Sequence, residues 1–211
     1  MNLGEPLGQG LAELGLKLAS PACETLLAYL DLLQKWNRVY NLTAVREPER
    51  MLYQHLLDCL AVIPHLTGSN LLDVGSGAGL PGIPVAIALP RLPVTLLESN
   101  HKKAAFLRQA AIELHIDNVG VVGERAEAWQ TSQRFDLVIS RALADIPEFI
   151  RLAGRLVAPG GALVAMKGVY PYDELAQLPA GWRLAQAVAL KVPGLQAERH
   201  WLRLESAGDA A

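Results

Sequence analysis

The chain of 211 residues has little of what marks membrane, disulfide-bonded or strongly basic proteins. No stretch approaches the roughly 18 uncharged apolar residues that a membrane-spanning helix needs. The N-terminus has neither a basic start nor an apolar signal core, so we expect a cytoplasmic protein. Only two cysteines are present, Cys23 and Cys59. Both lie in apolar, helix-like sequence, which favours reduced thiols over a disulfide or a metal site.

Charged residues are also scarce, at 19% of the chain, while 51% is apolar. This balance is typical of a folded globular protein and excludes a disordered one. The net charge is −2, whereas proteins that bind nucleic acid tightly and broadly are usually basic. Either the ligand is small, or the basic residues gather on one face.

A glycine-rich loop after a short apolar segment is the most informative feature present. It is the run Leu71-Leu72-Asp73-Val74-Gly75-Ser76-Gly77-Ala78-Gly79-Leu80-Pro81-Gly82. Glycines permit positive φ and let the backbone approach a ligand closely. A second apolar segment, 94–97, ends at Glu98, an acid placed to accept hydrogen bonds from both hydroxyls of a ribose. Together they predict half of a nucleoside-binding α/β fold.

The rest of the chain divides into a helical and an alternating part. Ser20 and Pro21 predict a helix start with Ser20 as the cap, and a second helix is expected from about Pro48 to Pro64. From Asn70 onward strands and helices alternate, which predicts a parallel sheet. Expected strands are 70–74, 93–98, 119–123, 135–140 and 161–166, and expected helices 82–89, 101–115 and 145–157. Two last strands, 183–192 and 199–205, have no room for a crossover helix between them and must pair antiparallel.

This architecture resembles the Rossmann-like class I fold of S-adenosylmethionine-dependent methyltransferases. The expected fold class is α/β, with a mostly parallel seven-stranded sheet that ends in an antiparallel C-terminal hairpin and carries an N-terminal helical extension. We expect residues 1–66 to be a helical segment packed on the core, and 67–211 to be the core that binds S-adenosylmethionine.

The glycine loop also satisfies the dinucleotide fingerprint, as Gly77-x-Gly79-x-x-Gly82. That match is poor, because the glycine that follows the strand directly is Gly75, and prolines crowd the helix start where a pyrophosphate would bind. The segment Asp73–Gly79 is more similar to the first motif of class I methyltransferases, whose loop holds the methionine part of the cofactor. After the third strand, Glu127 and a neighbouring backbone amide could bind an adenine edge.

The loop after the fourth strand, Ile139-Ser140-Arg141-Ala142, is expected at the methyl-accepting site. It lacks the Pro-Pro-aromatic sequence of amino-group methylases and the nucleophilic cysteine of carbon-5 pyrimidine methylases. These absences favour an acceptor that needs no deprotonation, such as guanine nitrogen 7. His55 and Asp58, three residues apart on a helix, are then expected to be a structural pair rather than an acid–base pair.

The whole chain resembles the bacterial small-subunit ribosomal RNA guanine-N(7) methyltransferases, the RsmG or GidB family. The resemblance covers residues 20 to 205. It rests on Lys35-Trp36-Asn37, Tyr40-Asn41-Leu42-Thr43, Asp73 to Pro84, Ile139 to Ala142, Met166-Lys167-Gly168, and Val192 to His200.

The resemblance implies a cofactor, a substrate and a set of site residues. The cofactor is S-adenosylmethionine, contacted by Gly75, Leu80, Ala126, Glu127 and Arg141, in addition to the motif residues Asp73, Gly77, Gly79 and Glu98. Asn41, Arg125, Arg141, Lys167 and Arg199 would surround the acceptor. The implied substrate is one guanine in the 530 loop of 16S rRNA, as free RNA, as the small ribosomal subunit or as an assembly precursor, and no metal takes part.

Two other functions stay open from the residues alone. One is a methyltransferase of the same fold that acts on a small molecule or a protein. The other is a non-catalytic nucleoside-binding module.

Overall fold

The structure is a computed structural model and describes residues 3–141 and 144–209. Ala142, part of the motif after the fourth strand, lies outside the described residues.

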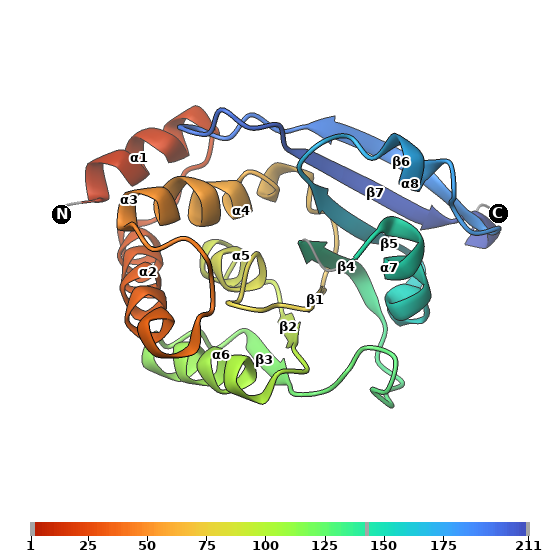
Figure 1. Cartoon of the computed structure of the whole chain (residues 1–211), viewed down its shortest axis with the longest axis horizontal. Helices are drawn as coiled ribbons and strands as arrows, with labels where there is room; N and C mark the ends of the chain where they lie inside the picture. The colour runs from red at the N-terminus through yellow and green to blue at the C-terminus, as the bar shows by residue number, and fades with distance from the viewer. Residues whose placement is uncertain (1–2, 142–143, 210–211) are drawn as a thin grey trace.

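The described residues form one seven-stranded sheet with the strand order β3-β2-β1-β4-β5-β7-β6 (Figure 1). Strands β1 to β5 run parallel, and β7 pairs antiparallel with both β5 and β6. The mostly parallel sheet and its antiparallel C-terminal hairpin are therefore confirmed. The strands are β1 (Leu71–Val74), β2 (Val94–Leu97), β3 (Val119–Val122), β4 (Phe135–Arg141), β5 (Val157–Lys167), β6 (Trp182–Ala189) and β7 (His200–Ser206).

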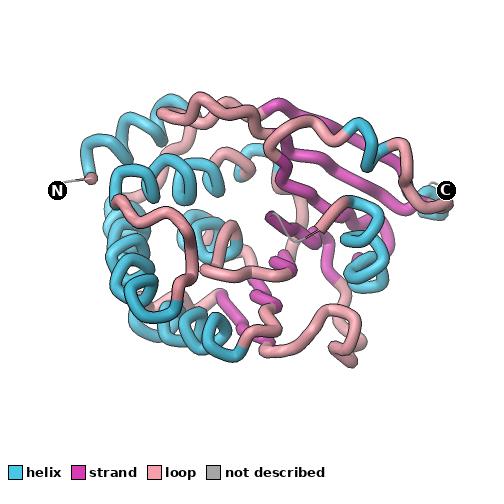
Figure 2. The backbone as a smooth tube through the Cα atoms, viewed as in Figure 1, coloured by secondary structure: helices cyan, strands magenta, loops and turns pink. Residues whose placement is uncertain are grey.

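Helices cover both faces of the sheet (Figure 2). The longer helices are α1 (Gly4–Glu13), α2 (Ser20–Tyr40), α5 (Gly82–Ala88), α6 (His101–Glu113) and α7 (Ile146–Ala153). The shorter turns are α3 (Pro48–Met51), the π-helix η1 (Leu52–Leu57), α4 (Asp58–Leu60), η2 (Ile63–His65), η3 (Gly154–Leu156), α8 (Tyr172–Leu175) and η4 (Ala207–Asp209).

The strands send alternate side chains to two separate apolar clusters. Leu71 and Leu137 belong to one cluster, and their neighbours Leu72 and Val138 to the other. This alternation is the period of two that a strand buried on both faces requires. The first cluster also contains the buried residues of α1, α2 and η1. The N-terminal helices therefore share a core with the sheet, and the division at residue 66 stays a prediction.

Element boundaries differ from the predictions in several places. Helix α7 ends at Ala153 rather than near 157, and β5 begins at Val157 rather than near 161. Ser20 does not cap α2: the cap residue is Ala19, whose carbonyl accepts hydrogen bonds from the amides of Ala22 and Cys23. The helix predicted from Pro48 contains the π-helical turn η1, whose wider winding has no local sequence signal. Strand β6 ends at Ala189 rather than near 192, although the Leu190 amide still donates to the Arg199 carbonyl at 2.7 Å, and a turn follows at Pro193 and Gly194.

No helix within the described residues is long and apolar enough to span a membrane.

Candidate functional site

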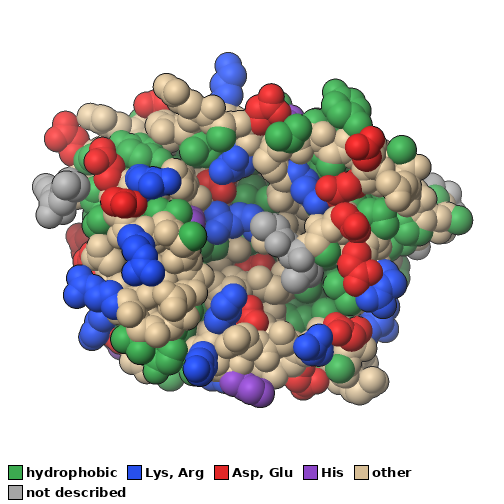
Figure 3. All heavy atoms as spheres, in the orientation of Figure 1, with side chains coloured by type: hydrophobic (Ala, Val, Ile, Leu, Met, Phe, Trp, Pro, Cys, Tyr) green, Lys and Arg blue, Asp and Glu red, His purple; other side chains and the backbone are tan. Residues whose placement is uncertain are grey.

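Two neighbouring cavities lie at the carboxyl ends of the parallel strands. The larger cavity has a volume of about 520 Å³ and the smaller about 410 Å³, and Gly75 lines both. Ligands of open α/β sheets bind at this edge, where the loops after successive strands meet. Lys and Arg side chains gather around the middle of the face shown in Figure 3, although the chain as a whole is acidic.

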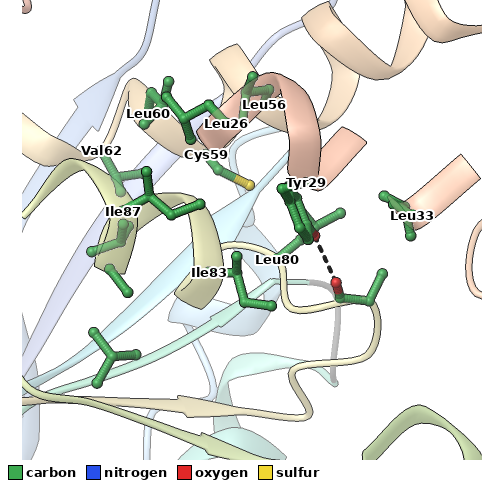
Figure 4. Packing of buried hydrophobic residues seen from close by; sticks show 14 of the residues in the cluster. Leu26, Tyr29, Leu33, Leu56, Cys59, Leu60, Val62, Leu80, Ile83 and Ile87 are labelled. Carbon is green, nitrogen blue, oxygen red and sulfur yellow. Dashed lines mark hydrogen bonds between the residues drawn. The ribbon is translucent and has the colours of Figure 1, made fainter. Parts of the chain in front are cut away.

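The glycine loop between β1 and α5 is held by buried polar groups. Asp73 is fully buried, and its Oδ2 accepts a hydrogen bond from the Gly82 amide at 2.9 Å. The Tyr29 hydroxyl of α2 donates to the Ala78 carbonyl at 2.6 Å, so the loop is also tied to the N-terminal helices (Figure 4). Burial raises the pKa of Tyr29 well above its usual value, which keeps this donor protonated. The loop is therefore held by the Asp73 carboxylate of β1 and by the Tyr29 hydroxyl of α2.

The glycines of this loop have different roles. A Cβ added at Gly77, where φ is +59°, meets only the Gly75 carbonyl at 3.8 Å and otherwise open space, and Gly77 lines the larger cavity. A Cβ at Gly79 would lie 2.6 Å from Ile83, and one at Gly82 would lie 2.7 Å from Asp73. Gly77 leaves open space at the larger cavity, whereas Gly79 permits close packing of the loop on α5, and Gly82 lets the start of α5 pack closely on Asp73 of β1 and Leu96 of β2.

Glu98 stands at the end of β2, as expected, but its oxygens already have protein partners. Oε2 accepts from the Gly77 amide at 2.8 Å and Oε1 from the Asn100 amide at 2.7 Å. Each carboxylate oxygen keeps a second lone pair for a ligand hydroxyl. Glu98 therefore braces the loop, and its contact with a ribose stays a prediction.

Two arginines of the larger cavity meet at one buried carboxylate. Arg141 at the end of β4 donates from Nη1 to Asp58 Oδ2 at 3.1 Å, and Arg199 before β7 donates from Nε to Asp58 Oδ1 at 2.8 Å. Asp58 is 3% exposed, and the arginines are 22% and 25% exposed. Burial by itself lowers the pKa of Arg141, but the neighbouring Cys59 and Asp58 raise it on balance, so the guanidinium stays charged.

His55 is not the partner of Asp58, contrary to the prediction. Its Nδ1 lies 3.0 Å from the Gln54 carbonyl, and its Nε2 lies 2.7 Å from Thr43 Oγ1. Burial, with the nearby charge of Arg141, lowers the pKa of His55 to about 4. The ring is neutral, Nδ1 donates to the carbonyl, and Nε2 accepts from the Thr43 hydroxyl. His55 thus fixes the segment that follows α2, of which Thr43 lines the larger cavity.

Lys167 at the end of β5 also has a carboxylate partner. Its Nζ lies 2.7 Å from Glu174 of α8 and donates to the Ala144 carbonyl at 3.0 Å. Glu174 in turn accepts from the Ile146 amide, at the start of α7. Lys167 therefore connects the cavity to the segment that leads into α7.

The structure brings most of the predicted site residues together. Those that line the larger cavity are Gly75, Gly77, Leu80, Arg141, Lys167 and Arg199. Those that line the smaller cavity are Gly75, Arg125, Ala126 and Glu127. Arg125 is thus separated from the other predicted acceptor residues; it is exposed and pairs with Glu127 at 3.6 Å.

Four predicted residues are not among the lining residues of either cavity: Asn41, Asp73, Gly79 and Glu98. Asn41 is exposed, has a left-handed backbone with φ of 49°, and accepts a hydrogen bond from Arg46. Direct ligand contacts of these four residues stay predictions.

Sequence reasoning missed the roles of Tyr29, Asp58 and Glu174. Asp58 is 83 positions from Arg141 and 141 from Arg199, so no local spacing could have indicated the cluster. Only its position three residues after His55 pointed to it.

Comparison with known proteins decides the family. A family model described as "GidB: rRNA small subunit methyltransferase G" matches residues 22–202. A protein of Nitrosospira multiformis named "Ribosomal RNA small subunit methyltransferase G" is 56% identical over 215 residues, which cover 99% of this chain and 100% of that protein. The chain belongs to the GidB family. The resemblance drawn from the sequence motifs is thus confirmed.

Solved structures of other methyltransferases share the fold of this GidB family member. A SAM-dependent methyltransferase from Aquifex aeolicus matches with a TM-score of 0.56 and 16% identity, over 82% of this chain and 97% of that one. TrmN from Thermus thermophilus matches with a TM-score of 0.55 and 21% identity, over 70% of this chain and 48% of that one. The expected Rossmann-like methyltransferase fold is confirmed.

Proposed function

We propose that the protein transfers a methyl group from S-adenosylmethionine to ring nitrogen 7 of one guanine in the 530 loop of 16S rRNA. Membership of the GidB family supports ribosomal RNA methylation as the activity, since the relative from Nitrosospira is named for it. The 530 loop comes from the resemblance alone, and the nitrogen 7 position comes from the resemblance and from the absence, in the sequence after the fourth strand, of groups that would activate other acceptors.

The two neighbouring cavities are the observation that carries the cofactor assignment. A nucleoside joined to an amino acid needs an elongated site, and Gly75 is common to both cavities. The open space at Gly77 is where a side chain would obstruct a ligand. We infer that the adenosine part lies near Ala126 and Glu127, within reach of Glu98, and that the methionine part lies along Gly75, Gly77 and Leu80.

The larger cavity is lined by cationic side chains that suit an RNA acceptor, whereas His55, Asp58 and Cys59 are not in a state to act as a general base. The His55 ring is neutral and both its nitrogens are hydrogen-bonded. Asp58 is paired with two arginines, and burial raises the pKa of the Cys59 thiol far above its usual value. When bound, S-adenosylmethionine supplies an electrophilic methyl group, and its transfer to nitrogen 7 releases no proton, so no base is needed.

The chain's own contribution is then to orient the acceptor. Arginine donors suit the O6 and N7 edge of guanine and the RNA phosphates. We propose that Arg141 and Arg199 orient the acceptor nucleotide, that Lys167 supports the segment before α7, and that Arg125 and Asn41 contact neighbouring RNA. Catalysis is mainly the positioning of donor and acceptor.

A methylation assay with nucleoside analysis tests this function. The purified protein is incubated with S-adenosylmethionine carrying a labelled methyl group and with small ribosomal subunits or 16S rRNA that lack the modification. We expect the label in 7-methylguanosine after digestion of the RNA. Label in another nucleoside would correct the acceptor atom, and label only in protein, or none, would overturn the RNA assignment.

A pair of glycine variants tests the cofactor site within the same experiment. Gly77→Val should abolish cofactor binding in calorimetry, because its side chain enters the larger cavity. Gly181→Val is the matched control, since Gly181 also has a positive φ and open space around its Cβ, but lies just before β6. Equal cofactor affinity in both variants would contradict the assignment.

A further inference from the structure

Asp58 contacts both arginines of the larger cavity and uses a different oxygen for each. Among residues 3–141 and 144–209, the hydrogen bonds of these two side chains engage Nη1 of Arg141, and Nε and Nη1 of Arg199. A guanidinium carries five N–H donors. Both Nη2 groups therefore remain to donate to a ligand in the cavity.

The carboxylate has two physical effects on this pair. Two guanidinium groups that face one cavity repel each other, and the negative charge between them offsets that repulsion. Arginine side chains also have many rotamers, so a partner that orders them beforehand reduces the entropy lost when a ligand binds. Asp58 is buried with both oxygens engaged, which suits a supporting group rather than one that contacts substrate.

The local backbone explains how Asp58 reaches the arginines. Asp58 follows the π-helix η1 directly, and such wide turns are frequent at functional sites. The Gln54 carbonyl within this turn accepts a second hydrogen bond from Arg141, at 3.2 Å. The π-helical turn and the residue that follows it thus supply the two groups that hold Arg141.

We propose that Asp58 is a positioning residue: its carboxylate holds Arg141 and Arg199 together at the larger cavity so that both act on the RNA substrate. This inference rests on the proposed function, because it assumes that the arginines act on RNA. It assigns the N-terminal helical segment a part in the acceptor site.

A double-mutant cycle with Arg199 tests the proposal. Asp58→Asn removes the charge at nearly constant volume and should lower kcat/KM for rRNA by about tenfold, mainly through a higher KM, while cofactor affinity changes by less than about threefold. Because Asp58 acts partly through Arg199 and partly through Arg141, the double variant Asp58→Asn with Arg199→Ala should lose clearly less than the product of the two single losses. Independent residues would instead multiply their losses.

Glu205→Gln is the matched control, because Glu205 also bridges two arginines, Arg183 and Arg203, but on the hairpin and among none of the lining residues of the two cavities. It should leave kcat/KM unchanged. A comparable loss in this control would show that general destabilisation explains the effect and would overturn the proposal.

The outcomes separate this inference from the proposed function. If Arg199→Ala leaves rRNA methylation unchanged, the assigned role of the arginine fails whatever Asp58 does. If Arg199→Ala is impaired and Asp58→Asn is not, or if the losses multiply, only the positioning role is wrong. Should Asp58→Asn fail to fold, Asp58→Glu replaces it: this variant keeps the charge but displaces both arginines, and a fully active Asp58→Glu would contradict the proposal.

Discussion

At the scale of single residues, the Asp73 carboxylate stabilises the glycine loop through a hydrogen bond, but burial makes its charged form unfavourable. Its Oδ2 accepts from Gly82, but Oδ1 is buried without a hydrogen-bond partner among the residues that the structure describes. Burial raises the pKa of Asp73 to about 7, and the Gly82 amide only partly offsets this. In the unfolded chain the same carboxyl titrates near 4. The folded protein therefore binds a proton here between about pH 4 and 7 that the unfolded chain has released.

The stability contributed by this proton should be complete below about pH 4 and be lost as the pH rises through 7. The measured quantity is the free energy of unfolding of the wild type minus that of Asp73→Asn, both without cofactor. We predict that this difference falls by roughly 3 kcal/mol between pH 4 and pH 8. Denaturant unfolding of both proteins at several pH values measures this difference, and every other titrating group cancels in the comparison. A difference that stays constant with pH would show that Asp73 is ionised throughout.

At the scale of elements, α2 is part of the machinery that shapes the cofactor site. Tyr29 reaches from α2 to the Ala78 carbonyl, and its ring lies next to Leu80 (Figure 4). Further along α2, the buried Asn37 accepts from the Thr43 amide and donates to the Val45 carbonyl. One helix therefore fixes both the glycine loop and a second segment at the larger cavity.

Tyr29→Phe should separate the hydrogen bond from the packing of this helix. The Ala78 carbonyl would lose its buried donor, which we expect to cost about 1–3 kcal/mol of stability. Cofactor affinity should fall as well, because the loop is less well ordered before binding. Thermal unfolding and calorimetry measure the two effects, with the exposed Tyr172→Phe as a control that should show neither. Wild-type affinity in Tyr29→Phe would mean that the loop keeps its shape without α2.

The sequence predicted the helices and strands that are determined by residues close together in the chain. Apolar segments that end at a glycine or at an acid predicted β1 and β2. Because parallel strands end at one edge of the sheet, the strand order along the chain also predicted that Gly75, Arg141 and Lys167 lie close together. The π-helical turn has no sequence signal, and the cap of α2 differs from the prediction by one residue. The pairing of Asp58 with two arginines has no local pattern, since it depends on contacts between distant segments. The same reason explains why Lys167 was expected at the acceptor but its partner Glu174 was not.

At the scale of the whole molecule, the net charge of −2 and an RNA substrate are compatible because the charges are unevenly placed. Lys103, Arg141, Lys167 and Arg199 all line the larger cavity. Asp58 and Glu174 neutralise part of this charge. A local cluster of limited net charge favours recognition of one RNA site over broad, tight binding to any RNA.

The salt dependence of RNA binding tests this distribution of charge. Each phosphate contact releases counterions, so the affinity of a protein for RNA falls with salt in proportion to the number of contacts. Arg199→Ala should therefore weaken binding to rRNA and make the salt dependence shallower by about one contact. Lys167→Ala should change the slope less, because Lys167 has Glu174 as its own carboxylate partner, whereas Arg199 shares Asp58 with Arg141. Arg183→Ala, which removes a cation on β6 paired with Glu205, should leave the slope unchanged. If Arg199→Ala keeps the wild-type slope while Arg183→Ala alters it, RNA binds to the hairpin surface and not at the larger cavity.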